Sequence, residues 1–185
     1  KFIFTSSAAV YGDSYPKTGP INPYGIAKLQ CEQWCDYYSE LGLNVIILRL
    51  SNVYGKGGKG VINQFITNAK NNVPLIINGN GNQTRDYIFI NDIIQVIDLI
   101  IKSDLANDIL NVSTNIGSNI WNIINLIIKL KQKPVEIDVY TELNNEIKHS
   151  RLDNSDLIMS EFLDLNKFRS FTTLRTGIER LWNEK

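Results

Sequence analysis

The chain has 185 residues and carries no net charge at pH 7, with 19 Lys and Arg against 19 Asp and Glu. Such a balance gives no electrostatic reason to bind nucleic acid or a membrane surface, and we expect neither as a partner. The longest apolar runs, near 93–101 and 120–130, are interrupted by polar residues and are too short to span a bilayer. A chain of this length can bury a substantial core. These bulk properties together lead us to expect a cytoplasmic protein.

Apolar patterns and turn residues predict alternating strands and helices. We expect strands at about 1–5, 45–50, 75–77, 87–90, 109–112 and 135–139, and helices at about 24–40, 61–71, 92–102, 118–131 and 171–183. Gly42 marks the end of the first helix, and Asn91 or Asp92 is the expected cap of the third. The run Val45–Leu50 reads as a buried parallel strand.

Tyr24 and Lys28 are four residues apart in the first predicted helix, so they lie on one face within side-chain reach. A free phenol titrates near pH ~10 and is a poor base at neutral pH, but a neighbouring cation favours the phenolate. Ser6 and Ser7 end the strand before this helix, at the edge where open α/β sheets bind ligands. These residue types suffice for proton transfer at a carbinol carbon. The alternative is an aromatic residue at a helix start beside an exposed lysine.

Four segments together resemble one family, in that family's order. They are Ser6–Gly12 (SSAAVYG), Asn22–Lys28 (NPYGIAK), Arg49–Gly55 (RLSNVYG) and Thr84–Ile93 (TRDYIFINDI). They resemble the extended short-chain dehydrogenase/reductase family, and within it the NAD-dependent nucleotide-sugar epimerases and dehydratases, most of all the UDP-glucose 4-epimerase type. Several linked motifs in order are far more specific than an isolated YxxxK.

The resemblance implies a fold and a domain organisation. The fold is α/β: the C-terminal portion of a Rossmann-type doubly wound parallel sheet plus a small α/β substrate-binding domain. Residues 1–58 would form the C-terminal part of the dinucleotide-binding domain with the catalytic Tyr and Lys. Residues 59–185 would form mainly the nucleotide-sugar domain, with about 92–112 returning to the Rossmann sheet.

The resemblance also implies roles for single residues. Tyr24 is the acid/base, Lys28 stabilises its phenolate and binds the cofactor ribose, and Ser7, rather than Ser6, binds the reacting substrate oxygen. The residues implied in NAD binding are Tyr24, Lys28, Ser51 and Thr5. Those implied in substrate binding are Ser7, Asn52, Ile76, Asn78, Arg85 and Glu146.

Alternatives remain for several of these positions. Ser51 and Asn52 end the strand that contains Arg49, and they could simply cap a turn. A guanidinium at Arg85 can grip a diphosphate with two parallel hydrogen bonds, whereas the alternative is a surface salt bridge to Asp86 or Asp92. Arg49, inside an apolar strand, is expected in a buried structural ion pair.

Departures from the family pattern narrow the chemistry. Family dehydratases resemble one another in an acidic residue just before V-Y-G, where this chain has Ala8 and Ala9. No general acid for water loss remains there, which favours 4-epimerisation through a transient 4-keto sugar. Leu143 stands where the family has an arginine that contacts phosphate, three residues before Glu146.

The family's glycine-rich pyrophosphate loop, G-x-x-G-x-x-G, is not present in this chain. The glycines of 55–60 have another spacing, and we interpret them as a mobile loop on the substrate side. The chain opens on Lys1 within a strand-like run. We therefore expect the C-terminal part of a longer protein, with about a hundred residues of the dinucleotide half missing.

Three functional hypotheses follow. The first is an NAD-dependent epimerase of the UDP-hexose 4-epimerase type, a homodimer in its full-length form. The second is a nucleotide-sugar oxidoreductase or dehydratase of the same family. The third is a non-catalytic remnant that binds nucleotide sugar. We expect no metal site, and Cys31 and Cys35 are expected to be structural thiols.

Overall fold

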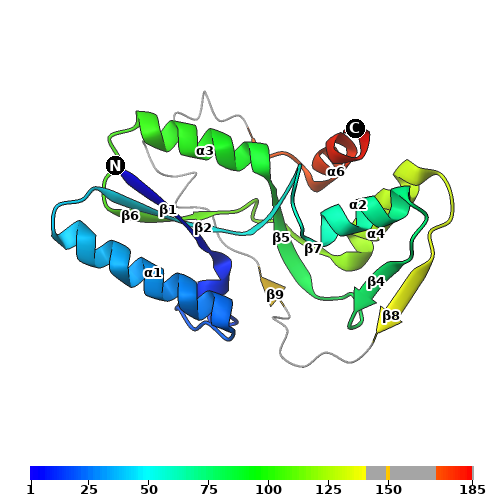
Figure 1. The fold of residues 1–185 in the computed structure, drawn as a ribbon, viewed down its shortest axis with the longest axis horizontal. Coiled ribbons are helices and arrows are strands. Elements are labelled where there is room, and N and C mark those ends of the chain that lie inside the picture. Colours follow the sequence, from blue (N-terminus) through cyan, green and yellow to red (C-terminus); the bar gives the residue numbers. More distant parts are fainter. Residues whose placement is uncertain (141–148, 151–169, 185) are drawn as a thin grey trace.

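The computed structural model describes residues 1–140, 149–150 and 170–184. Strands and helices alternate along the chain (Figure 1), as the apolar pattern predicts. In chain order they are β1 (Phe2–Ser7), the 3-10 helix η1 (Ala8–Val10), α1 (Pro23–Glu40), β2 (Val45–Leu50), β3 (Asn52–Tyr54), α2 (Val61–Lys70), β4 (Leu75–Asn78), β5 (Thr84–Phe89), α3 (Ile90–Lys102), β6 (Asp108–Val112), β7 (Gly117–Asn119), α4 (Ile120–Lys131), β8 (Ile137–Tyr140), β9 (His149–Ser150) and α6 (Leu174–Asn183). The fold is α/β.

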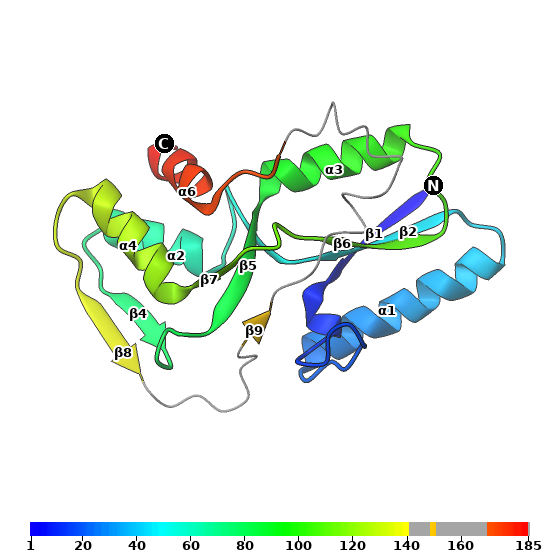
Figure 2. The same ribbon diagram turned by 180° about the vertical axis from the view of Figure 1, so that it is seen from behind.

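Strand β2 is the centre of a three-stranded parallel sheet with the order β1-β2-β6. Its Val45 and Ile47 pack with Cys35 of α1, whereas its Ile46 and Leu48 belong to the core that α3 covers. A strand buried on both faces needs a continuous apolar run, which is why this one lacks the alternation of a half-exposed strand. Figures 1 and 2 both show the sheet between α1 and α3.

The second half of the molecule has its own core, to which α2, α4 and α6 contribute buried side chains. There β5 pairs in parallel with β3 and β9 and antiparallel with β7, while β4 pairs in parallel with β8. Strand β5 joins the two cores: Tyr87 and Phe89 belong to the second core, whereas Ile88 between them belongs to the first. This alternation follows from the period of two in a strand. It places β5 between the halves, where residues of both can meet.

The start of α1 follows from its sequence. The side-chain oxygen of Asn22 accepts a hydrogen bond from the Gly25 amide at 2.8 Å, and Pro23 occupies the first helical position. Both features are favourable at a helix N-terminus, because Asn satisfies an unpaired amide and Pro needs no amide partner there. Tyr24 is thereby fixed in the first turn.

Two expected boundaries are wrong. Strand β5 begins at Thr84 and not at about residue 87, so Arg85 and Asp86 lie within the strand. Helix α3 begins directly after β5 with Phe89 as its N-cap residue and no side-chain cap, so neither Asn91 nor Asp92 caps it. The Asp92 carboxylate instead accepts hydrogen bonds from the amide and hydroxyl of Thr172, at 2.7 and 2.8 Å. The Asp92 side chain, which the local sequence pattern predicted as a possible helix cap, thus binds a residue far away in the sequence.

A smaller correction concerns Asn52, which opens β3 and does not end β2. The bend between these strands carries the chain from the first sheet to the second. As for membranes, none of the helices described is both long and apolar enough to cross one.

Candidate active site

Tyr24 and Lys28 lie together on α1, as their spacing predicts. The Lys28 Nζ is 5.8 Å from the centroid of the Tyr24 ring and 5.0 Å from that of Phe4. The same ammonium donates a hydrogen bond to the carbonyl oxygen of Thr5 at 2.8 Å. Strand β1 therefore holds the lysine beside the tyrosine, whose side chain is open to solvent with 57% of its surface exposed.

The two serines of β1 have different environments. Ser6 is buried and its hydroxyl donates a hydrogen bond to the carboxylate of Glu32 on α1. Ser7 is half-buried, and its hydroxyl accepts a hydrogen bond from the Ala9 amide at 3.2 Å as the N-cap of η1. Successive residues of a strand point to opposite faces of the sheet, so only one of these two hydroxyls can face α1, and that one is Ser6. Among the described residues, no acceptor binds the hydroxyl hydrogen of Ser7.

Gly25 allows the first turn of α1 to approach the segment after Ser7 closely. A Cβ at this position would overlap the carbonyl oxygen of Ala9 and would lie 2.9 Å from the Cβ of Pro20. Only a residue without a side chain permits this contact. The close approach brings Tyr24 to the carboxyl end of β1.

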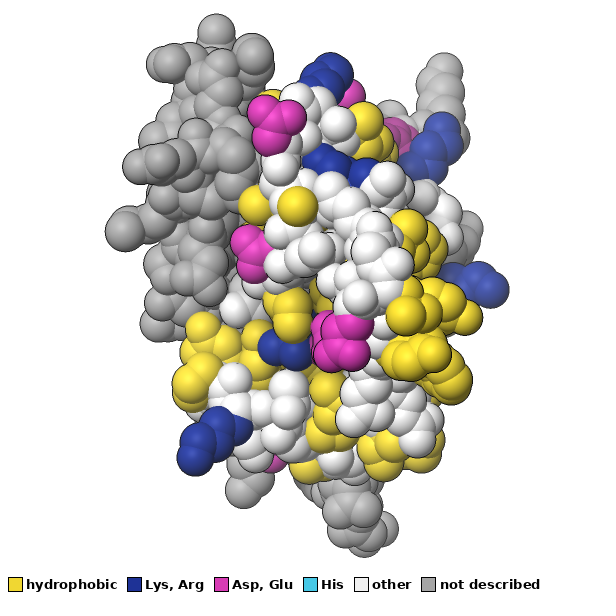
Figure 3. All heavy atoms as spheres, turned by 90° about the vertical axis from the view of Figure 1, so that its left-hand side faces the viewer, with side chains coloured by type: hydrophobic (Ala, Val, Ile, Leu, Met, Phe, Trp, Pro, Cys, Tyr) yellow, Lys and Arg dark blue, Asp and Glu magenta, His cyan; other side chains and the backbone are white. Residues whose placement is uncertain are grey.

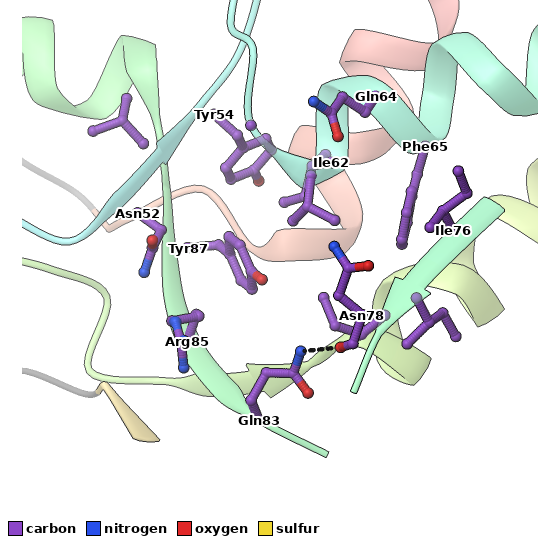
Figure 4. A pocket seen from close by; sticks show the side chains of 15 residues that line it. Asn52, Tyr54, Ile62, Gln64, Phe65, Ile76, Asn78, Gln83, Arg85 and Tyr87 are labelled. Carbon is purple, nitrogen blue, oxygen red and sulfur yellow. Dashed lines mark hydrogen bonds between the residues drawn. The ribbon is translucent and has the colours of Figure 1, made fainter. Parts of the chain in front are cut away.

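A pocket of about 320 Å³ opens in the second half of the molecule, between β3, β4, β5 and the start of α2 (Figure 4). Asn52, Arg85 and Tyr87 lie on one side of it, and Phe65 and Asn78 lie on the other. The full lining is Asn52, Val53, Tyr54, Gly60, Val61, Ile62, Gln64, Phe65, Ile76, Ile77, Asn78, Gln83, Arg85, Tyr87 and Ile120. It combines amide and guanidinium groups with aromatic and aliphatic walls, a mixture typical of ligand sites.

Asp86 of β5 binds residues of two neighbouring segments. Its carboxylate is fully buried and accepts hydrogen bonds from the Thr114 amide (3.0 Å) and hydroxyl (2.8 Å), the Ile116 amide (3.1 Å) and, at 3.4 Å, the Ser51 hydroxyl. Burial raises the pKa of Asp86, and the hydrogen bonds from Thr114 and Ile116 oppose that rise. Asp86 thus links β5 to Ser51 and to the segment that follows β6.

Asp86 and Asp92 are the two carboxylates considered as alternative salt-bridge partners of Arg85. Both carboxylates are buried, and their hydrogen bonds go to Thr114, Ile116 and Thr172. The Arg85 Nη1 donates to the carbonyl oxygen of Thr84 at 2.9 Å.

The glycine loop after β3 lies on the pocket side. Gly55 and Gly57 have φ of 151° and 75°, in the region where side chains are strained. The side-chain amide of Asn63 donates to the Gly55 carbonyl at 2.6 Å, and the loop ends at Gly60, the N-cap of α2 and part of the pocket wall. Its place agrees with the substrate-side interpretation.

The buried ion pair expected for Arg49 is confirmed. Its Nη2 lies 2.6 Å from the Oε2 of Glu32, which is itself almost fully buried on α1. In the described part of the chain, no three His, Cys, Asp or Glu side chains cluster closely enough to hold a metal ion.

The family model of the NAD dependent epimerase/dehydratase family matches residues 1–113. The chain belongs to this family. It is 36% identical over 118 residues to a UDP-glucose 4-epimerase of Rhizobium meliloti, covering 53% of this chain and 36% of that protein. It is 32% identical over 129 residues to a dTDP-D-glucose 4,6-dehydratase of Dictyostelium discoideum, covering 58% and 30%.

Solved structures of the family share the fold. A UDP-glucuronic acid 4-epimerase of Bacillus cereus, solved with UDP-glucuronic acid and NAD, superposes with a TM-score of 0.87 at 25% identity over 98% of this chain and 60% of its own. The chain thus spans less than two thirds of the family members it matches.

The residues singled out from the sequence fall into two groups. Asn52, Ile76, Asn78 and Arg85 line the pocket. The second group consists of Thr5, Ser7, Tyr24 and Lys28, which gather where α1 meets β1 and do not line the pocket. Ser51 lies between the groups through its hydrogen bond to Asp86. Glu146 and Leu143 lie outside the described residues.

Several pocket residues were not anticipated from the sequence. Phe65 lies on the apolar face of α2, and its helical spacing with Ile62 and Ile66 could have indicated a wall facing inward. Tyr87 lies two residues after Arg85 on β5, so the period of a strand could have placed both on one side, and Gln83 directly precedes the strand.

We expect Gly25→Ala to lower the free energy of unfolding by about 1–3 kcal/mol, because the new methyl group overlaps the Ala9 carbonyl. Urea denaturation measures the change. Gly117→Ala is the matched control, since a Cβ there meets only Thr84 at an ordinary 3.7 Å, and it should change stability by less than about 1 kcal/mol. Equal stabilities of the two variants would show that α1 does not need its close approach to η1.

Proposed function

We propose that this chain carries the proton-transfer centre and the nucleotide-sugar site of an NAD-dependent epimerase of the UDP-hexose 4-epimerase type. The observation that carries the proposal is the position of the Lys28 ammonium, held by the Thr5 carbonyl beside the Tyr24 ring. Membership of the family and the likeness to a UDP-glucuronic acid 4-epimerase support it. Residues 1–58 would serve the dinucleotide part, and 59–185 mainly the substrate part, with about 92–112 returning to the first sheet.

The donor set fits the nicotinamide half of NAD. Lys28 and Tyr24 offer an ammonium and a phenol to the ribose hydroxyls. Thr5 lies near the carboxyl end of β1 and Ser51 directly follows the neighbouring parallel strand β2, at the edge where open α/β sheets bind ligands. When bound, NAD supplies the acceptor and donor of the C4 hydride. The pyrophosphate-binding loop of the family is not among these 185 residues.

Tyr24 performs the proton chemistry in this proposal. As a phenolate beside the Lys28 ammonium, it takes the proton of the sugar 4-hydroxyl. The Ser7 hydroxyl donates a hydrogen bond to the same sugar oxygen. After the 4-keto sugar has turned over, Tyr24 returns the proton to that oxygen, so the hexose is recovered with inverted C4 and no net redox change.

The pocket anchors the part of the substrate that does not react. The Arg85 guanidinium offers parallel N–H groups to a diphosphate, and Asn52 offers its amide beside it. Ile76 and Asn78, on β4, would pack on the nucleotide base. Anchoring at the diphosphate lets the sugar present either face while the nucleotide stays in place.

Epimerisation is preferred over dehydration because of the residues that follow Ser7. Ala8 is buried with Val10 and Tyr11 in a small apolar cluster, and Ala9 offers a backbone carbonyl to the α1 contact. Neither side chain can donate a proton to a departing hydroxyl group. A released 4-keto product would instead favour the oxidoreductase or dehydratase alternative.

Tyr24→Phe should lower kcat for UDP-hexose epimerisation by about 10²- to 10⁴-fold while the Kd for UDP changes by less than about twofold, because the phenol acts on the sugar and the pocket holds the nucleotide. Chromatographic separation of the two epimers measures turnover, and titration calorimetry measures UDP binding. Tyr140→Phe, which removes an equally exposed phenol on β8, should leave both unchanged. Near wild-type epimerisation by Tyr24→Phe would refute the mechanism.

We further propose that the protein is a homodimer and cytoplasmic. The outer face of α1 exposes Ile26, Trp34, Tyr37 and Leu41, whose spacing of eight, three and four residues places them along one stripe. Figure 3 faces the left-hand side of Figure 1, where α1 lies in the lower part. It shows apolar side chains gathered in the lower half of the molecule. The charged residues of α1 follow a different line, at Lys28, Glu32, Asp36 and Glu40.

An uncharged aromatic stripe is self-complementary, so a second copy can pack on it about a two-fold axis without electrostatic repulsion. Another segment of the natural polypeptide is the competing occupant. The free thiols of Cys31 and Cys35 are in keeping with a reducing compartment.

Trp34→Glu should weaken self-association by about thirtyfold or more, because it places a charge in the centre of the stripe. Sedimentation of the natural polypeptide over a range of concentrations measures the effect. Ile94→Glu on α3 is the control, since Ile94 is 57% exposed against 63% for Trp34 but lies outside the stripe. A Trp34→Glu protein with the same mass profile as Ile94→Glu would rule out this dimer face.

A further inference from the structure

A buried polar network lies directly behind the proton-transfer centre. Glu32 is one turn beyond Lys28 on α1, and only 2% of its surface is exposed. Its carboxylate accepts a hydrogen bond from the Ser6 hydroxyl and three from Arg49, at 3.1, 3.2 and 2.6 Å. One side chain thus joins α1 to both β1 and β2.

Arg49 extends the network across the sheet. Its Nη1 donates to the Tyr11 hydroxyl at 2.9 Å, and that hydroxyl donates to the side-chain oxygen of Asn111 on β6 at 2.8 Å. Burial alone would lower the pKa of Arg49, but its hydrogen bonds to Glu32 and Tyr11 raise it. The guanidinium therefore stays charged, and the network spans the three strands of the first sheet and α1.

Stability alone is a weak reason for such a pair. Removing two charges from water costs about as much as their attraction returns, and an apolar pair of similar volume is often as stable. What an apolar pair lacks is direction, because a bidentate guanidinium and carboxylate fix the orientation of both partners. The network therefore contributes geometry more than stability.

That geometry concerns the reacting groups. Ser6 precedes Ser7 on β1, and Glu32 follows Tyr24 and Lys28 on α1. The strand and helix are tied twice, by Ser6 to Glu32 and by the Thr5 carbonyl to Lys28. Any slip of α1 along β1 would change the distance between Ser7 and Tyr24.

We propose that Glu32 and Arg49 are positioning residues of the proton-transfer centre, which set the placement of Tyr24 relative to Ser7 without touching substrate or cofactor. This inference rests on the proposed epimerase function. A misplacement of about 1 Å at a reacting group costs on the order of a hundredfold in rate. The pocket with Asn52 and Arg85 shares no member with the network, so nucleotide binding is independent of it.

The experiment compares the natural polypeptide with the double variant Glu32→Leu/Arg49→Met and the single variant Glu32→Gln. The double variant replaces the ion pair by an apolar pair, and its Tm should stay within a few degrees of the parent. Its kcat should fall by about ten- to hundredfold while KM for the UDP-hexose stays within about twofold. Glu32→Gln keeps the shape of the side chain and tests the same change in kcat if the double variant does not fold.

Asp98→Asn is the matched control, because the Asp98–Lys102 pair of α3 is an ion pair at 2.6 Å that is largely exposed. It should leave kcat unchanged. The positioning role is overturned if the folded double variant or the Glu32→Gln protein has the parental kcat. It is also overturned if only KM changes. Absence of epimerase activity in the parent itself overturns the proposed function and this inference together.

Discussion

The packing of helix α1 against strand β1 is the constraint on which the candidate site depends. Two polar ties and one close backbone approach hold it: Lys28 to the Thr5 carbonyl, Ser6 to Glu32, and Gly25 against Ala9. All three join the end of β1 or the following helix η1 to the N-terminal part of α1, where the chemistry is proposed. A helix held only by apolar side chains could shift by a fraction of a residue, whereas directional hydrogen bonds allow one register.

The two halves of the molecule present different chemical groups. The first sheet and α1 present a phenol, an ammonium and a hydroxyl, while the second half presents a pocket with a guanidinium and amides. Strand β5 and the bend between β2 and β3 connect them, with Asp86 buried at the junction. In the proposed function, this arrangement would hold the nucleotide at one place while the sugar reaches the other, as the turnover of the sugar in an epimerase requires.

Much of the fold and of the site could be predicted from the sequence, where the signal is local. The continuous apolar run of β2 and the Asn22-Pro23 start of α1 are local features, and both gave correct elements. The cap expected at Asn91 or Asp92 was wrong because α3 starts directly after β5, at Ile90, and the Asp92 carboxylate binds Thr172, 80 residues away. The partner of Arg49 could not be named for the same reason: a buried arginine implies a carboxylate, but only the packing of α1 on β2 selects Glu32.

We propose that this chain supplies the proton chemistry of a reversible C4 epimerisation. The direct measurement is a proton NMR time course of the natural polypeptide with UDP-glucose, recorded together with absorbance at the wavelength of reduced nicotinamide. We expect UDP-galactose to appear until the two epimers reach equilibrium, with no net accumulation of NADH or of a keto sugar. Release of a keto or deoxy product, or stoichiometric formation of NADH, would contradict it.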